Sequence, residues 1–137
     1  MTWNCTLVEY SGDWTEHKVG DMFWGPTLEE LKQDDPKWDY ALRTYASHLS
    51  DYYWANNSAR PPLFVMLPGL IPFCVDGQTW SHGVHSGGWT VTGVAPDITV
   101  GPSINQPMYH GFIQGGVISD DVEGRHYNEE GYEVRPV

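Results

Sequence analysis

The sequence has little positive charge. Its 137 residues include seven Lys and Arg against eighteen Asp and Glu, which gives a formal net charge of -11. A protein that binds a nucleic-acid backbone needs several clustered Lys or Arg side chains to displace the counterions of the phosphates. We therefore expect no direct binding to DNA or RNA. An acidic surface keeps a protein soluble, or imitates a phosphate backbone towards a protein that itself binds DNA.

Cysteines and long apolar runs are also scarce. Cys5 and Cys74 are the two cysteines, too few for the disulfide framework of a small secreted domain, and we expect both to be reduced. No window of about 18 apolar residues is present, as a membrane span would require. The first residues, MTWNCTLVEY, lack the basic start and apolar centre of a signal peptide. These features favour a protein that is neither secreted nor inserted in a membrane.

Large aromatic residues are abundant. Seven Trp and eight Tyr raise the hydrophobic fraction to 40%, which is enough to build one core in a chain of this length. We expect a single domain over residues 1–137. Its parts are a strand plus helices in 1–55, a β-rich module in 56–119 and an acidic peripheral arm in 120–137.

Helix signals are confined to the first part. Thr27 and Glu30 have the spacing of a capping box, which predicts a helix start. Asp35 followed by Pro36 restarts the helix, because proline suits a first helical turn but breaks an interior. The spacing of apolar residues then predicts one long amphipathic helix over about 36–54, with Trp38 at its start.

Strand signals dominate the second part. LFVML and LIPFCVD flank a Pro-Gly turn as a hairpin, and alternating segments follow at 88–105 and 109–119. We therefore predict an α+β fold in which an antiparallel sheet from the C-terminal half packs against the long helix. The residues expected in its core are Trp38, Leu42, Tyr45, Leu49, Phe64, Met66, Phe73, Trp89, Val91, Ile98, Val100 and Phe112.

A loose set of metal-ligand residue types follows the hairpin. His82 and His85 share one loop, with Cys74 before it and His110 after it. Imidazole and thiolate are the usual ligands of zinc, so these four residues form a candidate zinc site. A structural zinc site normally has two tight pairs, whereas only one loose pair is present, and a solvated loop is the alternative. We expect no cofactor other than this zinc.

Ser103 lies in a Gly-Pro-Ser turn, and His110 follows on the next strand candidate. If the two segments are neighbouring strands, the two side chains approach each other. Such a pair is typical of nucleophilic catalysis, with Asp97 or Asp120 as an acid that orients the histidine. The residues beside Ser103 do not match the glycine-flanked nucleophile elbow, and a serine in such a turn often caps backbone instead.

The successive segments RPPLFVMLPG, IPFCVDG, GWTVTGVAPDITVGPSIN and YHGFIQGGVIS, within residues 60–119, resemble a family of small bacteriophage proteins of unassigned function. The resemblance implies a phage origin and a common element whose matched positions are Trp89, Thr92, Pro96, Ser103, His110 and Gly111. From these we take Trp89, Pro96, Ser103 and His110 as candidate binding residues. The chain departs from the family at Gly101, where Ser is more common.

Some members of that family are labelled ammonia monooxygenase. That enzyme resembles a membrane-embedded metal assembly, whereas this sequence has no membrane span, so we do not expect this activity. We expect a non-enzymatic phage accessory protein that binds a host or phage protein in the host cytoplasm. A zinc-binding or metal-dependent hydrolytic domain using His82, His85 and His110 is one alternative. A component of the virion, such as a protein decorating the capsid, is the other.

Overall fold

The computed structural model describes residues 1–47, 49, 61–76, 80–81, 84–85 and 90–134. The strands are β1 (Trp3–Asn4), β2 (Thr6–Leu7), β3 (Asp21–Trp24), β4 (Leu63–Leu67), β5 (Ile71–Cys74), β6 (Trp80–Ser81), β7 (Val84–His85), β8 (Thr90–Thr92), β9 (Thr99–Gln106), β10 (Tyr109–Gln114) and β11 (Val117–Ile118). The helices are α1 (Leu28–Lys32) and α2 (Tyr40–Ser47), and a 3-10 turn spans Trp14–Glu16.

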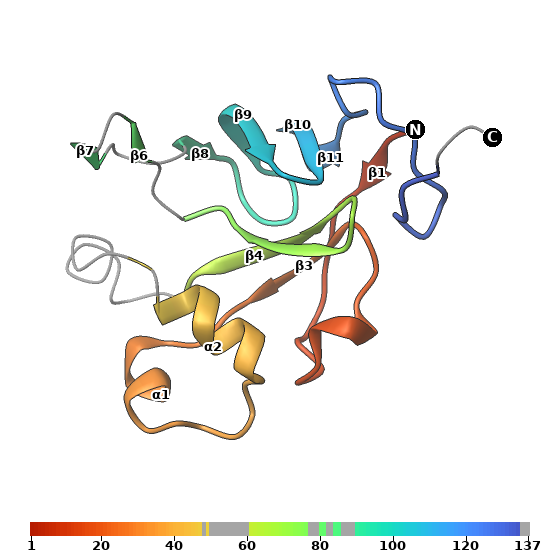
Figure 1. The fold of residues 1–137 in the computed structure, drawn as a ribbon. Helices are drawn as coiled ribbons and strands as arrows, with labels where there is room; N and C mark the ends of the chain where they lie inside the picture. Colours follow the sequence, from red (N-terminus) through yellow and green to blue (C-terminus); the bar gives the residue numbers. More distant parts are fainter. Residues whose placement is uncertain (48, 50–60, 77–79, 82–83, 86–89, 135–137) are drawn as a thin grey trace.

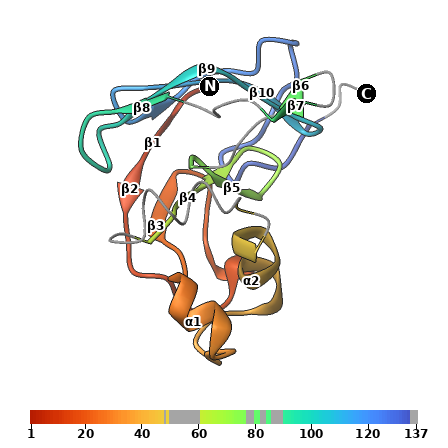
Figure 2. The ribbon, with the colours of Figure 1, turned by 90° about the vertical axis from the view of Figure 1, so that its left-hand side faces the viewer.

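The described elements form three layers (Figures 1 and 2). A five-stranded sheet in the order β1-β11-β10-β9-β8 forms one outer layer, and a four-stranded sheet in the order β2-β3-β4-β5 lies beneath it. Helices α1 and α2 lie on the far side of the second sheet. Strand pairs are antiparallel except β2 with β3. This is the sheet-rich α+β class that the sequence predicted, but the helices pack against the sheet of β2 to β5, and the sheet that contains the C-terminal strands β8 to β11 lies on the opposite face of that sheet.

The main core lies between the two sheets. Met22, Val65 and Phe73 come from the four-stranded sheet, and they pack with a set from the other sheet that includes Val100 and Ile104. A second core lies between the four-stranded sheet and the helices, and its members are Phe23, Trp38, Leu42, Ala46, Phe64 and Met66. Because β4 contributes to both cores, all five of its residues are buried, which explains the unbroken apolar run LFVML.

The predicted start of the long helix is wrong. Helix α2 begins at Tyr40, not at Pro36, and covers eight residues. Asp35 closes a turn before it, since its side chain accepts the Lys37 N–H at 3.0 Å. Asp39 then caps the helix by accepting the Leu42 N–H at 3.0 Å. The end of the predicted helix lies outside the described residues, so the described helical layer consists of two short helices.

Most of the expected core residues are buried, and two are exposed. The confirmed ones are Trp38, Leu42, Leu49, Phe64, Met66, Phe73, Ile98 and Val100. Tyr45 is 44% exposed because the buried side of α2 is a narrow stripe of Leu42 and Ala46. Phe112 is 37% exposed because it points outward from β10, between the inward-facing Gly111 and Ile113. Val91 is half-buried, and Trp89 lies outside the described residues.

Two local predictions are confirmed. Thr27 and Glu30 form both hydrogen bonds of a capping box at the start of α1, and β4 pairs with β5 as the expected hairpin. Neither helix in the described ranges has the length and apolar character of a membrane span.

Candidate functional site

The β9–β10 hairpin brings Ser103 and His110 together, as the sequence predicted. His110 pairs across the hairpin with Asn105, so Ser103 is its diagonal neighbour on the same face. The register shifts between Gly111 and Ile113, and such an irregularity re-aims side chains next to it. The Ser103 hydroxyl oxygen lies 3.2 Å from His110 Nε2.

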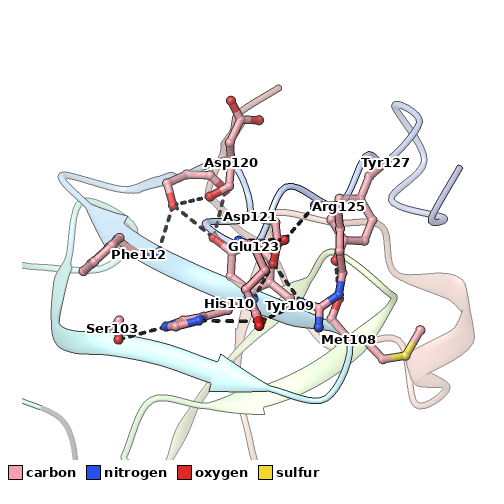
Figure 3. A network of polar contacts seen from close by, with 11 residues as sticks. Ser103, Met108, Tyr109, His110, Phe112, Asp120, Asp121, Glu123, Arg125 and Tyr127 are labelled. Atoms are coloured by element: carbon pink, nitrogen blue, oxygen red, sulfur yellow. Dashed lines mark hydrogen bonds and ion pairs between the residues drawn. The ribbon is translucent and has the colours of Figure 1, made fainter. Parts of the chain in front are cut away.

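The other nitrogen of the His110 ring faces a carboxylate. His110 Nδ1 lies 3.6 Å from Glu123 Oε2, so the ring stands between a hydroxyl and an acid (Figure 3). The acid is therefore neither Asp97 nor Asp120. Asp97 precedes β9 in the β8–β9 loop, whereas the 69% exposed Asp120 side chain pairs with the N-terminal amine. Sequence reasoning missed Glu123 because a turn after β11 returns it to the hairpin.

Asp121 holds this turn in place. Its side chain is fully buried, and its Oδ1 accepts the His110 backbone N–H at 2.7 Å and the Arg125 guanidinium at 2.9 Å. Its Oδ2 accepts the backbone N–H groups of Glu123 at 3.1 Å and Arg125 at 2.8 Å. Burial opposes ionisation, but these hydrogen bonds and the Arg125 charge outweigh it and lower the pKa of Asp121. A buried carboxylate thus fixes both the His110 backbone and the Glu123 loop.

The surface around His110 is partly apolar. The His110 side chain is 24% exposed, and Met108 and Phe112 flank it along the chain at 42% and 37% exposure. Val122, 53% exposed, is tied beside it because its N–H donates to the His110 carbonyl at 2.7 Å. Chemically, the arrangement offers a hydroxyl held to an imidazole and an apolar margin around the pair.

The zinc candidates are not brought together in the described residues. Cys74 ends β5 and packs on the helix side of the four-stranded sheet, whereas His110 lies on the outer face of the other sheet. The main core separates Cys74 from His110, so the two side chains cannot bind the same zinc ion, which needs metal–ligand distances of about 2 Å. The described residues contain no group of three or more His, Cys, Asp or Glu that could hold a metal.

The remaining candidates occupy other places. His82 and Trp89 lie outside the described residues, and the backbone of His85 pairs with that of Trp80 in the β6–β7 ribbon. Pro96 is half-buried in the β8–β9 loop. It lies so close to Gly116 that a Cβ at this glycine would be 2.7 Å from the Pro96 carbonyl oxygen. The Pro96 backbone therefore lies directly against Gly116 in the turn between β10 and β11.

A second region, which sequence reasoning missed, is a cavity of about 390 Å³ beside the helical layer. We call it the aromatic pocket, and its lining residues are Val8, Glu9, Tyr10, Trp24, Gly25, Glu30, Lys37, Trp38 and Pro61. They come from five separate stretches of the chain. The amphipathic spacing assigned Trp38 to the core, and no local pattern linked it to Tyr10 or Trp24.

The aromatic walls of this pocket are fixed by polar contacts. Tyr10 and Trp38 stack with ring centroids 5.4 Å apart and planes 16° from parallel. The Tyr10 hydroxyl donates to Asp39 at 2.7 Å, and the Trp38 indole N–H donates to Glu30 at 3.0 Å. Burial and the Asp39 carboxylate raise the pKa of Tyr10, so its hydroxyl stays protonated. Trp24 is 39% exposed and offers accessible aromatic surface at the pocket.

The pocket also has charged groups. Burial opposes ionisation of Glu30, but hydrogen bonds from Thr27 and Trp38 outweigh it and lower the pKa of Glu30 to about 2. The Lys37 ammonium lies 3.3 Å from Glu30 Oε2 and 4.9 Å from the centre of the Trp38 ring. The pocket therefore combines fixed aromatic faces, an ionised carboxylate and a cation at its edge.

Comparisons of the chain with known protein families, curated proteins and solved structures found no match.

Proposed function

We propose that this protein is a bacteriophage accessory protein that acts by binding another protein, and that the aromatic pocket is its contact site. The observation that carries the proposal is the pocket itself, in which Tyr10, Trp24 and Trp38 line a volume of about 390 Å³. Aromatic anchors in such pockets supply much of the energy of protein interfaces. The volume also lies within the usual range for small-molecule pockets, so the pocket has room for a side chain of a partner.

The order in these walls favours binding. The Tyr10 hydroxyl donates a hydrogen bond to the Asp39 carboxylate, and the Trp38 indole N–H donates one to the Glu30 carboxylate. Side chains that are already ordered lose little conformational entropy when a partner arrives. A partner therefore meets a surface that needs little rearrangement.

A matched pair of variants tests this proposal. Trp24→Ala removes accessible aromatic surface from the pocket, and Tyr132→Ala removes a 56% exposed aromatic residue that does not line it. Partners are captured from infected host cells with each protein, and the affinity of a purified partner is then measured by calorimetry. We expect Trp24→Ala to weaken binding by about 30-fold, as for an interface anchor of about 2 kcal/mol. Tyr132→Ala should leave the affinity unchanged, and equal loss or no loss in both variants would contradict the proposal.

The place of action follows from the partner. A host-cell partner places the protein in the host cytoplasm, whereas a structural phage partner places it on the virion. Mass spectrometry of purified phage particles distinguishes these two cases.

A second candidate function is hydrolysis by acyl transfer. The observation that favours it is spatial: the His110 ring lies between the Ser103 hydroxyl and the Glu123 carboxylate. In serine hydrolases the base lies in the same way between the nucleophile and the orienting acid. In this reaction the Ser103 oxygen attacks the acyl carbon of an ester or amide while His110 Nε2 takes its proton. The imidazolium then gives this proton to the leaving oxygen or nitrogen as its bond to the acyl carbon breaks. Water, activated by the same imidazole, finally hydrolyses the acyl-serine and restores the Ser103 hydroxyl.

A fluorophosphonate probe tests that candidate, because an activated serine oxygen forms a bond to phosphorus and expels fluoride. Mass spectrometry should find the adduct on Ser103 in the wild type and not in His110→Ala. Ser119 is the internal control, since its hydroxyl lies 2.9 Å from the Phe112 N–H that donates to it. Equal modification of Ser103 and Ser119, or of neither, would reject catalysis.

A further inference from the structure

We propose that the aromatic pocket binds a basic side chain of the partner, an arginine or a lysine, and that Lys37 occupies its place in the free protein. This inference rests on the proposed binding function and adds the chemistry of the group that is bound. It follows from where Lys37 lies, how Glu30 is held and what the exposed Trp24 offers.

Lys37 shows that the pocket accommodates a cation. Its ammonium lies 4.9 Å from the Trp38 ring centre, within the distance at which the electron-rich face of an indole attracts a cation. The same ammonium pairs with Glu30 at 3.3 Å. The Lys37 side chain is 60% exposed, and exposed ion pairs are weak. An incoming cation can therefore replace it.

The Glu30 carboxylate remains in position when Lys37 leaves. Its Oε1 accepts the Thr27 backbone N–H at 3.0 Å, and its Oε2 accepts the Trp38 indole N–H at 3.0 Å. These two bonds hold it at the pocket without any help from Lys37. Glu9 adds an exposed carboxylate to the lining, so the described lining residues other than Lys37 include two acidic groups and no cation.

The shape and charge of the pocket favour a basic side chain over an uncharged one. A guanidinium is planar and weakly hydrated, so it stacks on an aromatic face while it donates hydrogen bonds to a carboxylate. Trp24 supplies exposed aromatic surface and Glu30 supplies the carboxylate. A proline-rich segment would also fit aromatic walls, but it would leave Glu30 without a new partner after Lys37 is displaced. The net charge of -11 further favours the approach of a basic partner.

The direct test adds small probe molecules stepwise to the full chain. Binding is monitored by the indole N–H signals of Trp24 and Trp38 in a ¹⁵N–¹H spectrum. The probes are acetyl-arginine amide, acetyl-lysine amide and the uncharged acetyl-citrulline amide, which has nearly the shape of arginine. We expect saturable shifts of both signals with arginine and lysine, and at least about tenfold weaker binding of citrulline, as for the loss of a charge-assisted contact.

Three substitutions then test the place of Lys37 and the role of the pocket. Lys37→Met keeps an unbranched side chain and removes the charge, so it should increase the affinity for arginine several-fold. Lys32→Met removes an exposed charge from the last turn of α1 and controls for the change in net charge. Trp24→Ala should reduce the arginine affinity at least about tenfold. The Trp38 indole signal of each free variant shows whether the bond to Glu30, and with it the fold, is intact.

Three results would overturn the inference. They are equal binding of citrulline and arginine, weaker arginine binding by Lys37→Met than by Lys32→Met, and binding of acetyl-Pro-Pro amide but not of arginine. If arginine fails while Trp24→Ala still loses the purified partner, the pocket binds that partner by other chemistry and the proposed function stands. If Trp24→Ala also retains the partner, the proposed function fails as well.

Discussion

The buried carboxylate of Asp121 allows a quantitative test of the network around His110. Asp121→Asn keeps the size of the side chain but replaces one oxygen by an NH₂ group. Each carboxylate oxygen accepts two hydrogen bonds, from His110 N–H and the Arg125 guanidinium on Oδ1, and from Glu123 N–H and Arg125 N–H on Oδ2. In either orientation of the amide, two donors therefore face an NH₂ group.

Two lost hydrogen bonds to a charged group cost about 1.5 to 3 kcal/mol each. The Arg125 side chain is 27% exposed, and water can partly replace its contact, so we expect the lower part of this range. The free energy of unfolding should fall by about 3 kcal/mol, which leaves a typical domain folded at room temperature. In urea unfolding followed by tryptophan fluorescence, this loss lowers the midpoint by about 1.5 M for a slope of about 2 kcal/mol/M.

Asp120→Asn is the matched control, because the neighbouring carboxylate is 69% exposed and pairs with the N-terminal amine at the surface. It should change the free energy of unfolding by less than about 1 kcal/mol. If Asp121→Asn costs no more than Asp120→Asn, Asp121 does not hold the loop and our reasoning is refuted.

The effect of Asp121→Asn should also depend on pH. The pKa of Asp121 is lowered from its ordinary value of 3.8 in the folded protein. A carboxyl group with a lowered folded pKa adds stability above its unfolded pKa and loses it as the pH falls through the folded pKa. The difference between wild type and variant should therefore be constant from about pH 5 to 8 and shrink below about pH 4. A difference that vanishes between pH 7 and 5 would point to another titrating group.

Two further predictions concern the cores. Leu42→Ala should lower the free energy of unfolding by about 2 to 5 kcal/mol because Leu42 is fully buried, whereas Tyr45→Ala on the same helix should cost much less in the same urea experiment. Burial raises the pKa of Cys5 to about 12, so it should resist iodoacetamide at pH 8 until the protein unfolds. Alkylation of Cys5 in the native protein within minutes, seen by mass spectrometry, would contradict its burial.

The elements that the sequence predicted correctly are those encoded by neighbouring residues. The capping box needs Thr27 and Glu30 three residues apart, and the β4–β5 hairpin needs two apolar runs around one turn. The long helix failed at its start because a local rule placed Pro36 in the first turn, while Asp35 and Asp39 made competing backbone contacts. Tyr45 was misassigned because spacing alone does not show how wide a stripe the sheet covers.

The candidate site was predictable only in its local half. Ser103 and His110 belong to one hairpin, so adjacent strands were enough to place them together. Glu123 was not predictable, because it reaches His110 through a loop whose position depends on the buried Asp121. The aromatic pocket was still less predictable, since Tyr10, Trp24 and Trp38 meet only after the sheet and the helices have packed.

The location of the two sites makes their tests independent. The Ser103–His110 pair lies on the outer face of the five-stranded sheet, whereas Tyr10 and Trp38 pack with the core on the helix side of the other sheet. The main core lies between them, and distant sites without shared partners usually have additive effects. The double variant Trp24→Ala and His110→Ala should therefore lose partner binding like the first single variant and serine labelling like the second. If His110→Ala alone weakens partner binding, the two faces are coupled, and the binding surface extends beyond the aromatic pocket.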